Sequence, residues 1–379
     1  MFYKEYAAKL RRKNEEDLYI IKSVGEGATS FVYLAYNVDN KQYAVKLYLN
    51  KDSYSNEVNI LNSLKPHKSI VKLLSYGTGA LERGISEEAY QINHLFPNKT
   101  VIYAIFEYLS NFDLSHYVFS VSQKFPEKIA KKIFGEILDG VENLHKNGIT
   151  HGDIKLENVM LSKNFTFKLI DFGFARSSKK GLISEITGTK YYSAPEVYMT
   201  ATKAYDGEKN DIFALGVLSF VLVMRIFPFD RPLPSDAKYK YIIKGDMGKF
   251  WEKSNVESVK LSQEFKDLFS KMVKYHPKER LSLKEIKSHP WLSAESNNNS
   301  PIAPMKDQPK IDVMPRFHSC EFNKNKSEIS FNKIEKKANL SQGVFYSKNK
   351  IDEDAQLDFL RVELRKRRDM IKQKLLEDE

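Results

Sequence analysis

A short stretch of the chain gathers polar residues that could together transfer a phosphoryl group. Residues 151–173 read HGDIKLENVMLSKNFTFKLIDFG. Four residues separate Asp153 from Asn158, and a short apolar run then leads directly to Asp171. One carboxylate can accept the proton of a hydroxyl nucleophile, while an amide oxygen and a second carboxylate are hard ligands that suit Mg²⁺. This spacing predicts a site for metal-assisted phosphoryl transfer.

A lysine from a separate segment is a candidate for the same site. The predicted strand 42–48 reads QYAVKLY, and Lys46 interrupts its apolar run. A buried lysine needs a partner of opposite charge, and the best candidate is Glu57 in the predicted helix 53–64. The alternative is that both residues lie on solvated faces.

Two glycines, Gly25 and Gly27, lie between the predicted strand 18–24 and a second strand that runs through Ala35. Glycine lets backbone N–H groups approach phosphate oxygens without an intervening side chain. Taken alone, this pattern fits an ordinary tight hairpin equally well.

Together, these segments resemble the eukaryotic protein kinases of the Ser/Thr type. The resemblance is carried by the glycine loop, Y-A-V-K, H-G-D-x-K-x-x-N, D-F-G and T-G-T-K-Y-Y-S-A-P-E. It implies an α+β, two-lobed protein-kinase-like fold, with a small antiparallel β-sheet lobe plus one helix and a larger, mainly helical lobe. The expected organisation is a polar leader, helical or loose, over 1–17; a kinase domain over 18–292 with lobes 18–108 and 109–292; a disordered linker over 293–350; and an amphipathic helix over 351–379.

The resemblance also assigns roles to individual residues. Asp153 is the expected catalytic base, and Lys155 is expected to neutralise the γ-phosphoryl group of ATP. Asn158 and Asp171 are the expected Mg²⁺ ligands. The implied ATP-binding residues are Gly25, Gly27, Val32, Ala44, Lys46, Glu57, Glu107, Leu109 and Met160.

Residues downstream of the site are expected to support it. Thr189 resembles the threonine that bridges the catalytic acid and lysine, which together favour Ser/Thr specificity. Glu196 and Arg280 are expected to form a buried ion pair. Asp211 is expected to bond to the backbone of the catalytic loop and to cap its own helix.

Two residues depart from the family pattern. Gly152 stands where most kinases have an arginine that binds a phosphorylated loop, and Ser30 stands in place of a third glycine. Without that arginine a phosphate in the activation loop lacks its usual partner, so we hypothesise that activity does not require activation-loop phosphorylation. Glu185 is consistent with this, because it lies four residues before Thr189, where a phosphothreonine often stands. Ser184 keeps the opposite reading open. A second function class, a pseudokinase that acts as a scaffold, also stays open.

Substrate preference is weakly marked. Asp113 and Glu157 lie where basophilic kinases have acids that bind arginines upstream of the acceptor residue. Lys240 replaces a third such acid and argues the other way. The sequence favours a mild basic preference.

The remaining elements follow from apolar patterns. The amphipathic spacing predicts a long helix that ends at Asn147-Gly148. This helix is expected over 125–147. The other expected elements are strands over 71–76 and 102–109, a surface insertion over 77–99 and a buried helix over 212–224.

Composition limits the function classes. The chain has 379 residues, 42% of them hydrophobic, and a formal net charge of +11. No basic run is dense enough to predict nucleic-acid binding. The lone Cys320 excludes an intrachain disulfide, and we find neither a signal peptide nor a membrane span. We expect a cytoplasmic protein, with nuclear access left open.

The segment 352–379 has leucines on one predicted helix face and arginines on another. Three readings stay open: a partner or self-association segment, an autoinhibitory helix, and a solvated helix without a role. The expected partners are otherwise protein substrates with Ser or Thr acceptors.

Overall fold

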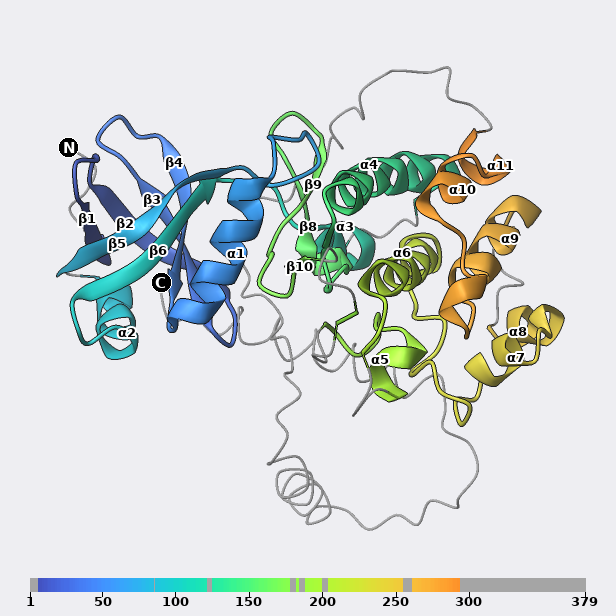
Figure 1. The fold of residues 1–379 in the computed structure, drawn as a ribbon. Helices are drawn as coiled ribbons and strands as arrows, with labels where there is room; N and C mark the ends of the chain where they lie inside the picture. Colours follow the sequence, from blue (N-terminus) through green and yellow to red (C-terminus); the bar gives the residue numbers. More distant parts are fainter. Residues whose placement is uncertain are drawn as a thin grey trace, which may run out of the picture. The chain divides into compact units, whose positions relative to one another are not determined.

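The computed structural model describes residues 6–84, 86–120, 125–177, 182–183, 188–199, 204–254 and 261–293. The expectations for Ser184, Glu185 and the tail beyond residue 293 lie outside these ranges. The described residues form a β-rich small lobe and a mainly helical large lobe (Figure 1). Within these ranges, no helix has the length and apolar character needed to cross a membrane.

The small lobe is a closed antiparallel barrel in the strand order β1-β2-β3-β4-β6-β5. Alternating side chains fill its interior, and the β3–β4 pair runs in unbroken register from Ser30 opposite Tyr48 to Tyr36 opposite Gln42. The strands are β1 (Ala8–Arg12), β2 (Leu18–Glu26), β3 (Ser30–Tyr36), β4 (Gln42–Tyr48), β5 (Leu73–Arg83) and β6 (Thr100–Glu107).

The expectation of a helical or loose leader is wrong for residues 8–12, which form β1. β1 pairs with β2 on one side and with β5 on the other, and so closes the sheet. Ala8 and Leu10 point into the barrel, whereas Arg11 is exposed. The alternation of apolar and basic residues in AKLRR is the strand pattern, but it is only five residues long.

The stretch between the fifth and sixth strands also differs from expectation. β5 extends to Arg83, beyond the predicted end at residue 76. The rest of the predicted surface insertion contains α2 (Glu87–Leu95), which packs against β2 and buries Ala89 and Ile92. These two residues are three positions apart, which is the helical spacing.

Helix α1 (Lys51–Ser63) packs against β4, β5 and β6, as Figure 1 shows. Asn50 caps it by accepting a hydrogen bond of 2.9 Å from the backbone N–H of Ser53. The buried face of α1 carries Val58 and Leu61 but also Glu57, a charged residue that requires a partner.

The large lobe is built around α4 and α6, which pack on each other. Asn147 ends α4 as predicted, and Gly148 follows with φ +67°. α6 is buried nearly all round, which explains its uninterrupted apolar sequence. The helices are α3 (Leu114–Ser120), α4 (Glu127–Lys146), α5 (Pro195–Met199), α6 (Gly207–Met224), α7 (Tyr239–Ile243), α8 (Met247–Lys253), α9 (Gln263–Met272), α10 (Leu283–Lys287) and α11 (Pro290–Ser293).

Two pairs of short strands flank the polar motif. β8 pairs with β9 and β7 with β10, both antiparallel. Two 3₁₀ turns complete the described structure. The elements are β7 (Ile149–Thr150), η1 (Leu156–Asn158), β8 (Val159–Leu161), β9 (Phe167–Leu169), β10 (Arg176–Ser177) and η4 (Pro277–Glu279).

The closed barrel predicts that β1 contributes to stability. Leu10→Ala removes a fully buried side chain, so we expect a loss of about 2–5 kcal/mol in the free energy of unfolding. Thermal or urea unfolding of the full chain measures it. Lys13→Ala, at an exposed position nearby, is the control. A loss below about 0.5 kcal/mol for Leu10→Ala would contradict the packing of β1.

Candidate active site

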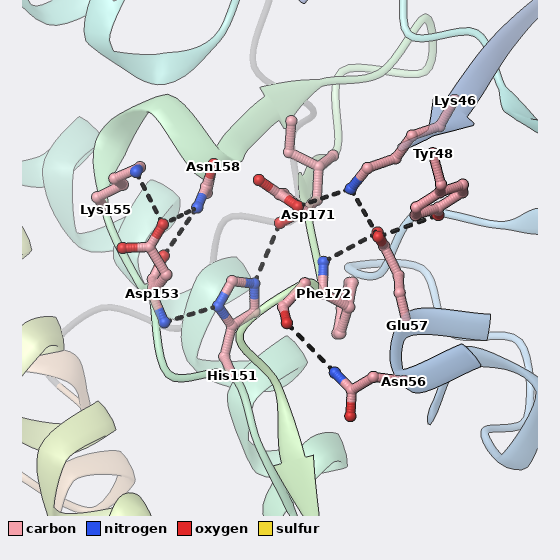
Figure 2. A network of polar contacts seen from close by, with 12 residues as sticks. Lys46, Tyr48, Asn56, Glu57, His151, Asp153, Lys155, Asn158, Asp171 and Phe172 are labelled. Atoms are coloured by element: carbon pink, nitrogen blue, oxygen red, sulfur yellow. Dashed lines mark hydrogen bonds and ion pairs between the residues drawn. The ribbon is translucent and has the colours of Figure 1, made fainter. Parts of the chain in front are cut away.

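Lys46 of β4 lies between two carboxylates that come from different parts of the chain. Its Nζ is 2.6 Å from Oε2 of Glu57 on α1 and 2.8 Å from Oδ1 of Asp171, which follows β9 (Figure 2). The hydroxyl of Tyr48 donates to the same Glu57 oxygen, and the backbone N–H of Phe172 donates to the other. The structure thus brings the three predicted charged residues together at the junction of the lobes.

The pKa directions of these groups follow from their proximity. Burial alone would lower the pKa of Lys46, but the carboxylates of Asp171 and Glu57 outweigh burial and raise the pKa above its ordinary value. Desolvation alone would raise the pKa of Asp171, but the ammonium group of Lys46 holds the pKa well below its usual range. Both groups are therefore charged at neutral pH.

Asp153 is the centre of a second polar cluster. Its Oδ1 accepts a hydrogen bond of 2.8 Å from Thr189 Oγ1, and its Oδ2 is 2.8 Å from Lys155 Nζ. Lys155 Nζ also donates to Thr189 Oγ1 at 2.8 Å. The expectation that Thr189 bridges these two residues is confirmed. The acid is held by donors on both oxygens, so its orientation is fixed.

Asn158 is oriented by the same acid. Its Nδ2 donates to the backbone oxygen and to Oδ2 of Asp153, both at 2.9 Å. This leaves the amide oxygen of Asn158 as an acceptor. The backbone N–H of Ile170 donates to the backbone oxygen of Asn158, so Asp171 follows directly beside it. An amide oxygen and a carboxylate with 44% of its side-chain surface accessible form a donor set that suits a hard divalent cation.

Asp211 on α6 forms hydrogen bonds with the backbone of the loop that precedes Asp153. It accepts the backbone N–H groups of His151 at 2.8 Å and Gly152 at 2.9 Å, and it lies 2.9 Å from His145 Nε2. The predicted contact with the loop is confirmed. The predicted cap is wrong, because α6 begins four residues earlier and Asp206 caps it.

Gly152 adopts φ +74°, a left-handed conformation that favours glycine. Its position leaves the loop without a side chain between His151 and Asp153. The His151 ring bridges the two halves of the motif: Nδ1 faces the backbone N–H of Asp153 at 3.3 Å, and Nε2 lies 3.1 Å from the backbone oxygen of Ile170.

The predicted nucleotide-binding residues lie on strands that flank Lys46. Val32 is directly opposite Lys46 in the β3–β4 register and opposite Gly25 in the β2–β3 register. The loop between β2 and β3 is closed by a hydrogen bond of 2.9 Å from the backbone N–H of Gly27 to the oxygen of Ser30. Ala44 of β4 pairs with Phe106 of β6.

Three further predicted nucleotide-binding residues, Glu107, Leu109 and Met160, lie near the connection between the lobes. Glu107 ends β6, and its Oε1 accepts from Lys168 Nζ at 2.7 Å and from the backbone N–H of Lys72 at 2.8 Å. Leu109 is buried, and Met160 of β8 is half-buried. These contacts fix the backbone that runs from one lobe to the other.

The predicted substrate-binding acids differ in their surroundings. Asp113 accepts the backbone N–H of His116 at the start of α3. Glu157 has a buried Oε2 without a hydrogen-bond partner among the described residues. Burial also raises the pKa of Glu157 above its ordinary value. Lys240 lies on α7 with its ammonium group over the ring of Tyr241.

The predicted Glu196–Arg280 ion pair is confirmed. Nη1 and Nη2 of Arg280 each donate to one Glu196 oxygen at 2.6 Å. Arg280 is fully buried on its side chain and also donates to the backbone oxygens of Lys209 and Lys274. These contacts join α5, α6 and the η4 turn, and so support the large lobe rather than the reaction centre.

Sequence reasoning missed several residues that the structure places at the site. Tyr48 forms a hydrogen bond with Glu57, and His145 forms one with Asp211. Asn56 donates from α1 to two backbone oxygens beyond Asp171. Tyr48 is two residues from Lys46 on one strand, so their shared face was readable. No pattern in the sequence pairs Asn56 or His145 with partners more than sixty positions away.

Comparison with known proteins agrees with the geometry. A family model described as "Protein kinase domain" matches residues 18–292. The chain is 30% identical over 276 residues to "CBL-interacting protein kinase 11" of Oryza sativa subsp. japonica, covering 71% of this chain and 50% of the relative. It is 28% identical over 316 residues to "Serine/threonine-protein kinase cds1" of Schizosaccharomyces pombe, covering 78% and 63%.

A third relative is "Serine/threonine-protein kinase SIK1" of Mus musculus, with 28% identity over 301 residues, 77% of this chain and 34% of the relative. The chain thus spans less than two thirds of the length of each of these three relatives.

Proposed function

The chain belongs to the protein kinase family, and we propose that it transfers the γ-phosphoryl group of Mg-ATP to serine and threonine hydroxyls of proteins. The observation that carries this proposal is the Asp153 cluster beside the Lys46 triad. In the first cluster, Lys155 and its neighbours orient the carboxylate of Asp153. In the second, the charged Lys46 is fixed between Glu57 and Asp171. The relatives whose names specify serine/threonine kinases support the acceptor class.

In the proposed reaction, the substrate hydroxyl lies against Asp153. The hydroxyl oxygen forms a bond to the γ-phosphorus, the bond from that phosphorus to the β,γ-bridging oxygen breaks, and ADP leaves. Asp153 accepts the hydroxyl proton, and Lys155 offsets the negative charge on the transferred group. Lys46 orients the α- and β-phosphates, because Glu57 and Asp171 fix its ammonium group.

Asn158 and Asp171 are the residues that would hold Mg²⁺. A bound Mg²⁺ would supply positive charge that offsets the negative charge of the phosphate groups. The N–H donors of Gly25 and Gly27 would approach the phosphates from the small lobe. Val32, Ala44 and Met160 would contact the adenine ring, and the backbones of Glu107 and Leu109 would face its polar edge.

Loss of the proposed base tests the activity. We expect Asp153→Asn to lower phosphoryl transfer by about 10²-fold or more, because the hydroxyl proton then lacks an acceptor. Radiolabelled ATP with a generic protein substrate measures transfer, and a fluorescent nucleotide measures binding. Asp39→Asn, at an exposed turn, is the matched control. Nucleotide binding without transfer by the unaltered chain would instead favour the pseudokinase alternative.

A second proposal concerns regulation. We infer that activity is independent of activation-loop phosphorylation, since Gly152 offers no cation to a loop phosphate. Phosphatase treatment of the purified chain should change its specific activity by less than about twofold. Mass spectrometry confirms that phosphate has been removed. A collapse of activity after treatment would reject this inference.

A third proposal is a mild preference for basic residues upstream of the acceptor. Asp113 and Glu157 resemble the acids that bind arginines in basophilic kinases. Oε2 of Glu157 has no hydrogen-bond partner among the described residues, and because that oxygen is buried the side chain would have to turn outward to accept from a guanidinium group. Glu157→Gln should lower the kcat/KM advantage of arginine-containing over alanine-containing peptides by about tenfold, because a charge-assisted bond is lost. Glu264→Gln, at an exposed position, is the control. An array profile that selects acidic or proline-directed peptides would reject the preference.

A further inference from the structure

We propose that Asn56 is a positioning residue that ties α1 to the segment after Asp171 and keeps Glu57 in place without a loop phosphate. The Asn56 clamp consists of the two hydrogen bonds from Asn56 Nδ2 to the backbone oxygens of Gly173 and Ala175. This inference rests on the proposed kinase activity and deepens its regulation.

The contacts of the clamp are direct. Asn56 Nδ2 lies 3.2 Å from the oxygen of Gly173 and 3.1 Å from that of Ala175. Figure 2 shows the amide reaching from α1 to the backbone beyond Phe172. One NH₂ group has two donors, so it can satisfy both oxygens at once. The clamp therefore joins residues more than a hundred positions apart through backbone atoms.

The two oxygens also meet a second donor from the same segment. Arg176 Nη1 lies 3.3 Å from the oxygen of Gly173 and 2.9 Å from that of Ala175. Arg176 begins β10, which pairs with β7 immediately before the catalytic loop. The clamp is thus connected through β10 to the strand that leads to His151.

Because Asn56 is next to Glu57 in the sequence, the clamp also restrains the ion pair between Glu57 and Lys46. Glu57 faces Lys46 and the backbone N–H of Phe172, while Asn56 holds the next residues of the same segment. A rotation or outward shift of α1 would break the clamp and the ion pair together. The clamp therefore favours the arrangement in which Lys46 is paired.

Charge-independent bonding distinguishes this device from a phosphate switch. The clamp uses a neutral amide and main-chain oxygens, so it requires no modification of the chain. Gly152 has no side chain that could bind a phosphate in the loop. Loss of two hydrogen bonds of ordinary strength is enough to shift a conformational equilibrium by about tenfold.

The test compares variants of the full chain after phosphatase treatment. Asn56→Leu keeps the size of the side chain but removes the donors, and Asn56→Gln keeps an amide. Asn59→Leu makes the same change at an exposed position on α1. The measurements are kcat, KM for ATP, the melting temperature, and hydrogen exchange of backbone amides in α1 and in residues 173–177.

We expect Asn56→Leu to lower kcat by about tenfold and to speed exchange in residues 173–177, with KM for ATP changed by less than about twofold. Asn56→Gln should recover part of both, and Asn59→Leu should resemble the unaltered chain. Unchanged kcat and exchange in Asn56→Leu would overturn the proposal. So would a loss that follows the melting temperature and is not rescued by Asn56→Gln.

Hydrogen exchange and kcat together distinguish a failure of the clamp from a failure of the proposed kinase activity. If the unaltered chain transfers no phosphoryl group, the kinase function fails and a role of the clamp in catalysis fails with it. If the unaltered chain is active while Asn56→Leu matches it in both kcat and exchange, only the clamp fails. Asp153→Asn serves as the inactive reference in the same assay.

Discussion

The arrangement of the two lobes depends on one interaction, the pairing of the buried Lys46 with the carboxylates of Glu57 and Asp171. Lys46 is 7% exposed, and neither β4 nor its barrel neighbours supply a carboxylate to it. Glu57 comes from α1 and Asp171 from beyond β9, so satisfying the lysine requires the barrel, the helix and the large lobe to meet at one point. The Lys46–Glu57 pair is buried, and removing one partner of a buried pair costs about 3–5 kcal/mol, which makes this meeting a strong constraint.

The large lobe meets the constraint by fixing backbone rather than side chains alone. Asp211 on α6 accepts two consecutive N–H groups of the catalytic loop, and His151 connects that loop to the backbone before Asp171. The acid of Asp153 and the acid of Asp171 are therefore held by the same framework. A loop anchored only by its own turns could not keep the two at a fixed separation.

The sequence predicted the parts whose chemistry is local. Lys46 in an apolar strand and the acid-to-amide spacing at Asp153 required specific partners, and the structure supplies them. The β1 strand and the α2 helix escaped prediction because five or nine residues give too few repeats of a period. The cap of α6 was misplaced because Asp206 and Asp211 are both plausible caps, and only the tertiary contact of Asp211 with the loop distinguishes them.

Contacts to main-chain atoms are the class that sequence reasoning could not reach. A charged residue in an apolar segment indicates from the sequence that it needs a partner, whereas every residue has the same backbone oxygen. Asn56 follows this logic: its amide satisfies the oxygens of Gly173 and Ala175, whose side chains play no part in the contact. A helix held in this way is tied to the path of the neighbouring chain, not to its sequence. The pairing of Lys46 then depends on backbone geometry that the residues themselves do not encode locally.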